Sequence, residues 1–313
     1  METRIRVELD KEQEEVVDSS ESMVVIAGPG SGKTRMLTEK ARVLFNSGEN
    51  ILCLCFTRSA AREMASRVPG LPCSTIHSYC CGRVGWRNKW GYDGLLWRFL
   101  TQRDIEKFGW VLVDEVQDLN EMELDVVLTL IGNKVFAVGD PYQSIYGFQG
   151  AMGPKVVRLL GTMGCKEVLL HNNYRSCARI VDKLNRIYSR KLVSKGIKDT
   201  GLTAILCRTN DDVFQVSNFL IESGIPHRLR LSMEQSDSRE YDVLGESNLR
   251  LSTCHQSKGR EFDHVLLFGW IPNRGIGEEV RLYYVSVARA SKSFREAPNL
   301  DSLLKALEGL RCN

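Results

Sequence analysis

The sequence lacks the features of a membrane-spanning, secreted or zinc-binding protein. No apolar run approaches the roughly 18–20 residues that a helix needs to cross a bilayer, so we expect no membrane partner. The first residues, Met1 to Arg4, show no basic start followed by an apolar core, which argues against a secretory signal. The ten cysteines include no C-x-x-C pair, so buried reduced thiols in a cytoplasmic protein explain them better than a zinc site.

The sequence also has little net charge. A formal charge of +3 over 313 residues is too small to indicate a polyanionic partner, although a local basic groove is compatible with it. The composition, 43% hydrophobic and 26% charged, is that of an ordinary globular protein. A chain of this length has room for two domains of usual size.

What the sequence does contain is a repeated alternation of short apolar runs with helical patterns. This alternation predicts an α/β fold with parallel sheets. A glycine-containing stretch at 161–164 suggests the break, so we expect one domain over 1–164 and a second over 165–313. The predicted strands cover residues 23–26, 51–56, 110–113, 134–138, 167–170, 203–207, 249–253 and 264–268.

The most informative stretch reads Ala-Gly-Pro-Gly-Ser-Gly-Lys-Thr over 27–34, between a predicted strand and a predicted helix. This unit is typical of a P-loop, whose N–H groups and lysine bind ATP phosphates and whose threonine suits Mg²⁺. Ala27 stands where the commonest pattern has glycine, and a chance glycine-rich turn is the alternative. The predicted ATP-binding residues of this stretch are Gly28, Pro29, Gly30, Ser31, Gly32, Lys33, Thr34 and Arg35.

A second apolar strand delivers two carboxylates. Asp114 and Glu115 directly follow the predicted strand 110–113, at the end where open α/β sheets bind ligands. We expect Asp114 to hold the Mg²⁺ that Thr34 also contacts, and Glu115 to orient the attacking water. A purely structural role for the pair is the alternative.

Other strand-end residues carry weaker signals. Gln143 follows a third strand and could sense the γ-phosphate, whereas Gln13 could pair with the adenine edge, with a surface glutamine as the default. Phe56 is a candidate for base stacking, with core packing as an equal alternative. Tyr146 and Phe148 could face a strand of nucleic acid from the loop that carries Gln143.

Taken in order, these stretches resemble the motifs of superfamily 1 DNA helicases of the UvrD/Rep/PcrA type. The resemblance extends over nearly the whole chain, and so many motifs in order are more specific than any one of them. The segments are 9–13 (Q motif), 27–34 (I), 56–64 (Ia), 75–78 (Ib), 113–118 (II), 138–150 (III), 173–176 (IV), 253–262 (V) and 284–290 (VI).

The resemblance implies two RecA-like domains with an ATP cleft between them. Lys33, Glu115 and Gln143 would act from the first domain. Arg175 and Arg289 would act from the second as arginine fingers, a contribution worth about 10³–10⁵ in rate in other NTPases. Without the family context, surface ion pairs would be the default interpretation of these two arginines.

The same resemblance assigns the remaining nucleotide and DNA contacts. Tyr174 would stack on the adenine, Gln13 would read its edge and Glu261 would contact the ribose. A single strand of DNA would cross both domains. Its predicted contacts are Phe56, Thr57, His77, Tyr146, Phe148 and His255.

The sequence departs from that family mainly in size. The family's two accessory insertions are reduced to about 79–107 and to the short polar stretch 232–247. The first remnant mixes tryptophan and tyrosine with arginine and lysine, which suits DNA contact or strand separation or, equally, packing on the first domain. Phe148-Gln149 stands where the family usually has Trp-Arg, which removes one cation near the strand.

We therefore expect an ATP- and Mg²⁺-dependent single-stranded DNA translocase and helicase, 3′ to 5′ by resemblance. Its expected substrates are single-stranded DNA and tailed duplex DNA, with replication or repair proteins as partners. The expected location is the cytoplasm, that of a bacterial host if a phage encodes the chain. The alternatives are an ATPase that remodels protein–DNA complexes without processive unwinding, and a non-catalytic DNA-binding or partner-binding module.

Overall fold

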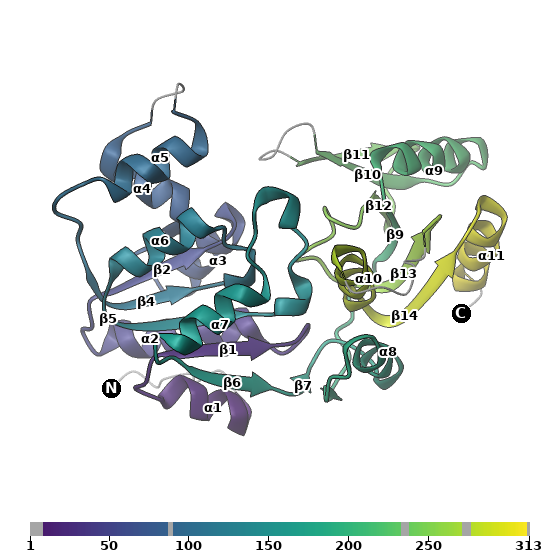
Figure 1. The fold of residues 1–313 in the computed structure, drawn as a ribbon. Helices are drawn as coiled ribbons and strands as arrows, with labels where there is room; N and C mark the ends of the chain where they lie inside the picture. The colour runs from purple at the N-terminus through teal and green to yellow at the C-terminus, as the bar shows by residue number, and fades with distance from the viewer. Residues whose placement is uncertain (1–8, 87–89, 233–237, 271–276, 312–313) are drawn as a thin grey trace. The chain divides into compact units, whose positions relative to one another are not determined.

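The computed structural model describes residues 9–86, 90–232, 238–270 and 277–311. The chain forms two compact units, Met1–His171 and Asn172–Asn313 (Figure 1). Each unit contains a six-stranded sheet of its own. Among the described residues, no helix combines the length and the apolar character that crossing a membrane requires.

The first unit is built on an all-parallel sheet with the strand order β3-β2-β4-β5-β1-β6. Its strands are β1 (Met23–Ala27), β2 (Ile51–Cys55), β3 (Cys73–Thr75), β4 (Phe108–Val113), β5 (Ile131–Gly139) and β6 (Lys166–Leu170). Its helices are α1 (Lys11–Asp18), α2 (Lys33–Asn46), α3 (Arg58–Arg67), α4 (Ile76–Val84), α5 (Gly91–Leu100), α6 (Glu121–Leu130) and α7 (Pro154–Thr162).

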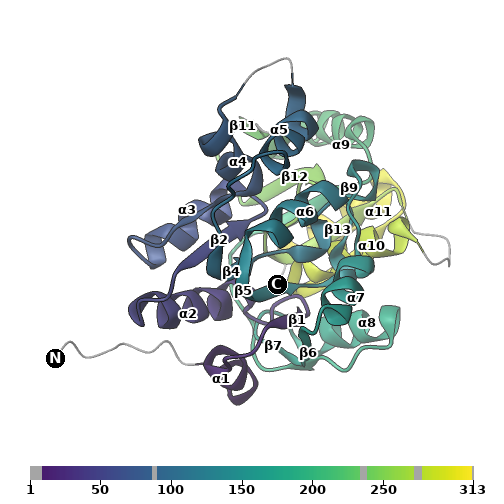
Figure 2. The same ribbon diagram turned by 60° about the vertical axis from the view of Figure 1, so that its left-hand side comes forward.

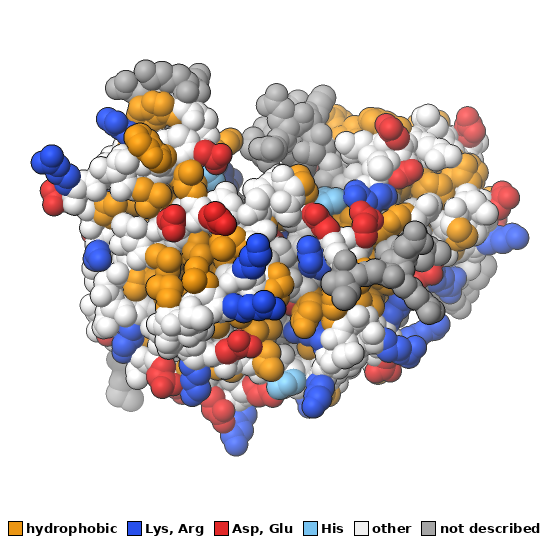
Figure 3. Space-filling view, in the orientation of Figure 1, with side chains coloured by type: hydrophobic (Ala, Val, Ile, Leu, Met, Phe, Trp, Pro, Cys, Tyr) orange, Lys and Arg blue, Asp and Glu red, His pale blue; other side chains and the backbone are white. Residues whose placement is uncertain are grey.

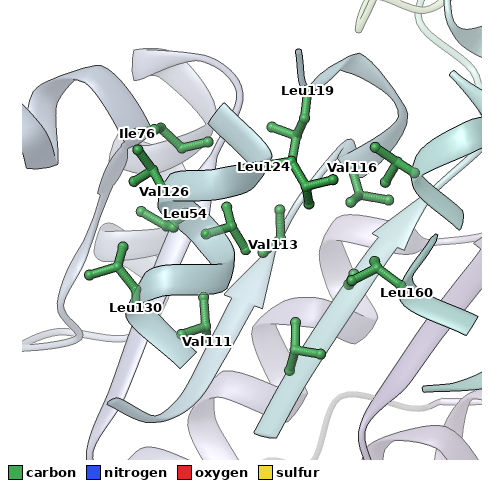
Figure 4. Packing of buried hydrophobic residues seen from close by; sticks show 14 of the residues in the cluster. Leu54, Ile76, Val111, Val113, Val116, Leu119, Leu124, Val126, Leu130 and Leu160 are labelled. Carbon is green, nitrogen blue, oxygen red and sulfur yellow. The ribbon is translucent and has the colours of Figure 1, made fainter. Parts of the chain in front are cut away.

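The buried stretches of the central strands are apolar, as expected for a parallel sheet with both faces covered. On one face, Leu54, Val111 and Val113 pack with side chains of α4, α5, α6 and α7 (Figure 4). On the other face, Cys53 and Leu112 pack with side chains of α1, α2 and α3. The first unit is therefore a three-layer α/β/α sandwich.

The strand β6 places the boundary between the units later than the sequence indicated. We expected a break between residues 164 and 165, with the strand 167–170 in the second half. Instead β6 pairs in parallel with β1, from Met23↔Lys166 to Ala27↔Leu170. Because this strand completes the first sheet, the first unit extends to His171.

The second unit contains a mixed sheet with the order β11-β10-β12-β9-β13-β14, in which β10 and β11 are antiparallel. Helices α9 and α11 pack against one face, while α8 and α10 pack on each other and against β14. A two-stranded ladder of β7 and β8 precedes this sheet along the chain. The elements are β7 (Asn172–Asn173), α8 (Ala178–Tyr188), β8 (Val193–Ser194), β9 (Thr203–Cys207), α9 (Asn210–Glu222), β10 (His227–Ser232), β11 (Ser238–Val243), β12 (Leu249–Thr253), β13 (Phe262–Phe268), α10 (Glu278–Ala288), β14 (Ala290–Ala297) and α11 (Leu300–Arg311).

Both reduced insertions contain regular structure. The stretch 79–107 includes most of α4 and all of α5, which pack on each other and lie side by side in Figures 1 and 2. The stretch 232–247 includes the strand β11, so it is more than a polar connection. Ion pairs of Arg228 with Glu240 and Asp242 run across this hairpin, which explains why its sequence is polar.

Candidate nucleotide and nucleic-acid site

The P-loop joins the end of β1 to the start of α2, as the sequence predicted. Gly30 has φ of +69° and Gly32 has φ of +79°, a conformation that side chains disfavour. A Cβ on Gly32 would also lie 2.9 Å from Nε2 of Gln13. Gly28 has no such positive φ, so the left-handed backbone accounts for two of the three predicted glycines.

Hydrogen-bond donors gather in the P-loop and in the first turn of α2 that follows it. The first N–H groups of a helix have no intrahelical acceptor and attract anions. Lys33 donates from Nζ to the carbonyls of Ala27 at 3.1 Å and Gly28 at 3.4 Å. Ser31 donates from Oγ to the same Gly28 carbonyl at 2.7 Å, which closes the loop. A triphosphate would replace these carbonyls as the partner of the Lys33 ammonium group.

Gln13 lies against the P-loop rather than on the surface. Its side chain is buried, and its Nε2 donates to the carbonyl of Ser31 at 2.7 Å. Its Oε1 accepts from the N–H of Asp10 at 3.2 Å in a capping box of α1. Because both ends of the amide already have partners, its role in reading the adenine stays a prediction.

Asp114 is a buried carboxylate at the end of β4. Its Oδ1 accepts from the N–H of Glu115 at 3.0 Å. Burial, followed by the nearby charge of Glu115, raises the pKa of Asp114 to about 7, while Lys33 opposes the rise. Such a carboxylate is costly to ionise unless a cation accompanies it.

This donor set fits Mg²⁺. The ion prefers oxygen ligands, and P-loop enzymes hold it with a hydroxyl of the loop and a strand-end aspartate. Thr34, in the first turn of α2, and Asp114, at the end of β4, supply those two groups. The buried carboxylate of Asp114 is the feature that a bound cation would neutralise.

The sheet order brings these groups to one edge. Strand β5 lies between β1 and β4, so the loop that follows it runs between the P-loop and Asp114. In that loop Gln143 is buried, and its Nε2 donates to Oδ2 of Asp140 at 2.9 Å. The three predicted catalytic positions of the first unit, Lys33, Glu115 and Gln143, therefore follow three neighbouring parallel strands.

The predicted DNA-binding aromatics form a row at the same edge. The rings of Phe56 and Tyr146 stack with centroids 5.4 Å apart, and those of Tyr146 and Phe148 meet edge to face at 6.1 Å. Phe148 is 65% exposed. Thr57 is exposed beside this row and caps α3 through its side chain. Phe56 is only partly buried and stacks on Tyr146, which disfavours pure core packing, and its contact with DNA stays a prediction.

His77 belongs to a different aromatic group, on α4 and α5. Its ring meets that of Tyr92 edge to face, with centroids 5.1 Å apart, and the ring centroids of Tyr92 and Trp86 are 5.5 Å apart. Burial lowers the pKa of His77, and its Nδ1 lies 3.5 Å from Glu123. Tyr92 and Trp86 are exposed, and Figure 3 shows apolar side chains gathered over this part of the first unit. The sequence assigned His77 and the Phe56 row to one DNA path, and that shared path stays a prediction.

In the second unit, Arg175 is held by two partners of its own unit. It donates from Nη2 to Oε1 of Glu261 at 2.5 Å and from Nη1 to the carbonyl of Ala288 at 3.2 Å. Lys198 contacts the other oxygen of Glu261 at 2.5 Å. Burial tends to raise the pKa of Glu261, but Arg175 and Lys198 outweigh it and hold that pKa below its usual range. Tyr174, the residue directly before Arg175, is 39% exposed.

Arg289 is buried at the C-terminal end of α10. It donates from Nε to the carbonyl of Val285 and from Nη1 to the carbonyl of Arg260, both at 3.2 Å. His255 is partly buried in the turn that follows β12. The structure therefore places all the predicted residues of the second unit on loops or helix ends, and their contacts with nucleotide or DNA stay predictions.

Three residues that support the site had no role in the sequence-based prediction. Asn173 is buried, and its Oδ1 accepts from the N–H groups of Arg175 and Ser176, which shapes the turn that presents Arg175. Asp140 orients Gln143, and Gln117 contacts the Glu115 side chain at 2.6 Å. For Asn173 and Asp140 the available signal was a short polar side chain inside a motif, because such groups bond to nearby backbone.

The fold and the loop after β1 define a P-loop protein with two RecA-like units. A family model described as an AAA domain matches residues 13–149, and one described as a UvrD-like helicase C-terminal domain matches residues 229–294. The chain is therefore related to the UvrD-type DNA helicases, as its motifs predicted.

Individual proteins agree with this relationship. DNA helicase II of Escherichia coli (strain K12) is 39% identical over 221 residues, 57% of this chain and 30% of that protein. DNA helicase II of Haemophilus influenzae is 29% identical over 220 residues, 57% of this chain and 29% of that protein. The chain thus spans less than a third of the length of these curated relatives.

A solved structure with the same architecture is that of Pif1 helicases at forked double-stranded DNA. It matches with a TM-score of 0.52 and 14% sequence identity, over 98% of this chain and 97% of that chain. At this identity the likeness concerns the fold alone.

The raised pKa of Asp114 predicts a pH-dependent gain in stability for Asp114→Asn in Mg²⁺-free buffer. The folded protein retains a proton that the unfolded chain releases, so ionisation of Asp114 costs stability between pH 3.8 and about 7. The variant avoids this cost. We expect its Tm to exceed that of the wild type by about 2–8 °C at pH 8 and by less at pH 5.

The matched control for this thermal-denaturation series is Asp125→Asn. It makes the same chemical change at an exposed position of α6, and its Tm should follow the wild type at both pH values. A lower Tm for Asp114→Asn than for the wild type at pH 8 would contradict the buried, cation-seeking carboxylate.

Proposed function

We propose that the chain is an ATP-dependent single-stranded DNA translocase and helicase. The observation that carries the proposal is the segment 140–150 after β5. This segment contains Gln143, which belongs to the nucleotide edge of the sheet, and Tyr146 and Phe148, which stack in the aromatic row with Phe56. One short segment thus joins the proposed ATP and DNA sites.

In the proposed reaction, the residues of the first unit bind and activate the nucleotide. Lys33 exchanges its carbonyl partners for phosphate oxygens, and Thr34 with Asp114 would hold Mg²⁺. When bound, that ion would neutralise negative charge that develops on the phosphate oxygens. Glu115 orients the attacking water, and Gln143 senses the γ-phosphate.

The second unit would contribute Arg175 and Arg289 as arginine fingers. Arg175 would have to leave Glu261, and Lys198 would then keep that carboxylate paired. Such fingers make hydrolysis depend on the approach of one unit to the other, which is how ATP turnover would drive movement. Tyr174 and Gln13 would contact the adenine, and Glu261 the ribose once Arg175 has left it.

The DNA strand would run along the aromatic row of the first unit and past His255 of the second. Base stacking on aromatic side chains contributes about 1–3 kcal/mol per base and does not depend strongly on sequence. By analogy with UvrD-type relatives, we propose 3′ to 5′ movement and a cytoplasmic role in DNA replication or repair, with tailed duplexes as substrates.

A second candidate is an ATPase that remodels protein–DNA complexes without processive unwinding. The small size of the two insertions favours it, because one consists of the α4–α5 pair and the other of the β11 hairpin. A non-catalytic DNA-binding module is disfavoured by the complete set of catalytic side chains.

The direct test of the ATPase is turnover with and without single-stranded DNA. We expect turnover that rises when DNA is added. Lys33→Ala removes the ammonium group that binds the phosphates, and we expect its kcat to fall by about 10²–10³-fold. No wild-type turnover in either condition would contradict the enzyme, and retained turnover in Lys33→Ala would show that the site is wrong.

Strand displacement separates the two candidate enzymes. A translocase that moves 3′ to 5′ should release the complementary strand from a duplex with a 3′ single-stranded tail and not from one with a 5′ tail. DNA-stimulated turnover without displacement of either duplex would favour the remodelling ATPase. Displacement from the 5′-tailed duplex alone would contradict the proposed direction.

The aromatic row predicts a local loss of DNA affinity for Phe148→Ala. Removing one stacking ring should weaken single-stranded DNA binding by about 1–3 kcal/mol, which corresponds to about 5–150-fold in Kd. The control is Phe214→Ala on α9, which removes a ring that is 48% exposed in the second unit. Fluorescence anisotropy with a labelled oligonucleotide measures both, and equal affinities for the two variants would refute the assignment.

A further inference from the structure

Gln117 is a completely buried polar side chain between the carboxylates of Glu115 and Asp118, which follow β4, and the loop after β5. It lies in the 3₁₀ turn Val116–Asp118 and has no exposed surface. A buried amide is costly unless its donors and acceptor have partners. The hydrogen-bond partners of the Gln117 amide therefore indicate the role of the residue.

Both ends of the Gln117 amide are used. Nε2 donates to Oε2 of Glu115 at 2.6 Å and to Oδ2 of Asp118 at 3.3 Å. Oε1 accepts from the N–H of Asp140 at 3.0 Å. Since a backbone N–H can only donate, the oxygen of the amide must face Asp140 and the nitrogen must face the carboxylates.

The contact with Asp140 continues to the phosphate-sensing residue. Oδ2 of Asp140 accepts from Nε2 of Gln143 at 2.9 Å, and Oδ1 accepts from the N–H of Tyr142 at 3.2 Å. A chain of hydrogen bonds thus runs from Glu115 through Gln117 and Asp140 to Gln143. It links the ends of two neighbouring strands, β4 and β5.

Two backbone features accommodate this arrangement. Glu115 has φ of +49° and ψ of +45°, a left-handed conformation that a non-glycine residue adopts only when its surroundings hold it there. At position 139, a Cβ would lie 2.3 Å from Oε1 of Gln117. Gly139 therefore leaves the space that the Gln117 amide occupies.

We propose that Gln117 is a positioning residue that fixes the Glu115 carboxylate and the Gln143 loop relative to each other. The inference rests on the proposed ATP hydrolysis. The side chain of Gln117 bonds to Glu115, Asp118 and Asp140, and its carbonyl accepts from Ser144 and Gly153; none of these residues belongs to the P-loop. Its loss should therefore affect the chemical step and leave nucleotide binding unchanged.

The test compares Gln117→Glu and Gln117→Met with the wild type. The glutamate variant retains an acceptor for Asp140 but directs an oxygen at two carboxylates, whereas methionine retains the length and removes all three side-chain hydrogen bonds. Supporting groups of this kind typically cost about 10–100-fold in activity when they are replaced. We expect kcat for ATP to fall by that factor while KM changes by less than about twofold.

The control is Asn120→Ala. Asn120 caps α6 in a capping box with Glu123, and its loss costs helix stability without touching the Gln117 network. Its kcat should stay close to that of the wild type. Binding of a fluorescent ATP analogue and thermal melting establish that each variant is folded.

Hydrogen exchange of the wild-type protein tests the network without any variant. The amide proton of Asp140, which bonds to Gln117, should exchange slowly with solvent.

Every result of these measurements either supports or overturns the proposed role of Gln117. Wild-type turnover with an unchanged kcat in a folded Gln117 variant would overturn the inference, as would an equal fall in Asn120→Ala. A rise in KM as large as the fall in kcat would also overturn it, because it would indicate collapse of the binding site. Rapid exchange at Asp140 would refute the hydrogen bond. Absence of wild-type turnover would instead contradict the proposed function, and with it the inference.

Discussion

The order of three parallel strands is the constraint on which the rest of the structure depends. Strand β5 lies between β1 and β4, and all three end at the same edge. The P-loop, the Asp114–Glu115 pair and the loop of Gln143 are therefore neighbours, although they are far apart in the sequence. No side-chain interaction could bring these groups together if the strands paired in another order.

The same edge concentrates polar groups that are costly to bury. Asp114, Asp140, Gln117 and Gln143 are all buried there, and burial raises the pKa of Asp114 to about 7. Hydrogen bonds satisfy the side chains of Gln117 and Gln143, whereas the nearby charge of Lys33 only partly opposes the effect of burial on the pKa of Asp114. We interpret this edge as a binding site for Mg²⁺ and a triphosphate. Burying its polar groups lowers the folding stability of the protein but prepares them for these ligands.

The sequence was sufficient to predict most of the fold because its signals are local. Buried parallel strands have no alternation of polar residues, so runs such as Met23–Ala27 and Ile51–Cys55 were recognisable. Strands with polar sequences were missed. β14 and the β10–β11 hairpin read as polar segments, because their exposed positions carry charges.

The site was predictable where a motif specifies the chemistry, and unpredictable where contacts between distant segments do. The loop of Lys33 and the position of Asp114 follow from local sequence. The Gln117–Asp140 hydrogen bond joins residues 23 positions apart, and the ring contact of His77 with Tyr92 depends on the packing of α4 on α5. Neither can be derived from spacing along the chain.

The central claim is that segment 140–150 couples nucleotide to DNA. If binding at one of two sites changes the affinity of the other, the change is equal in the reverse direction. The most direct measurement is the Kd of a labelled single-stranded oligonucleotide with no nucleotide, with ADP, and with a non-hydrolysable ATP analogue. Our account predicts different DNA affinities in the three states and a matching effect of DNA on the affinity for the analogue. The same Kd in all three states would contradict it.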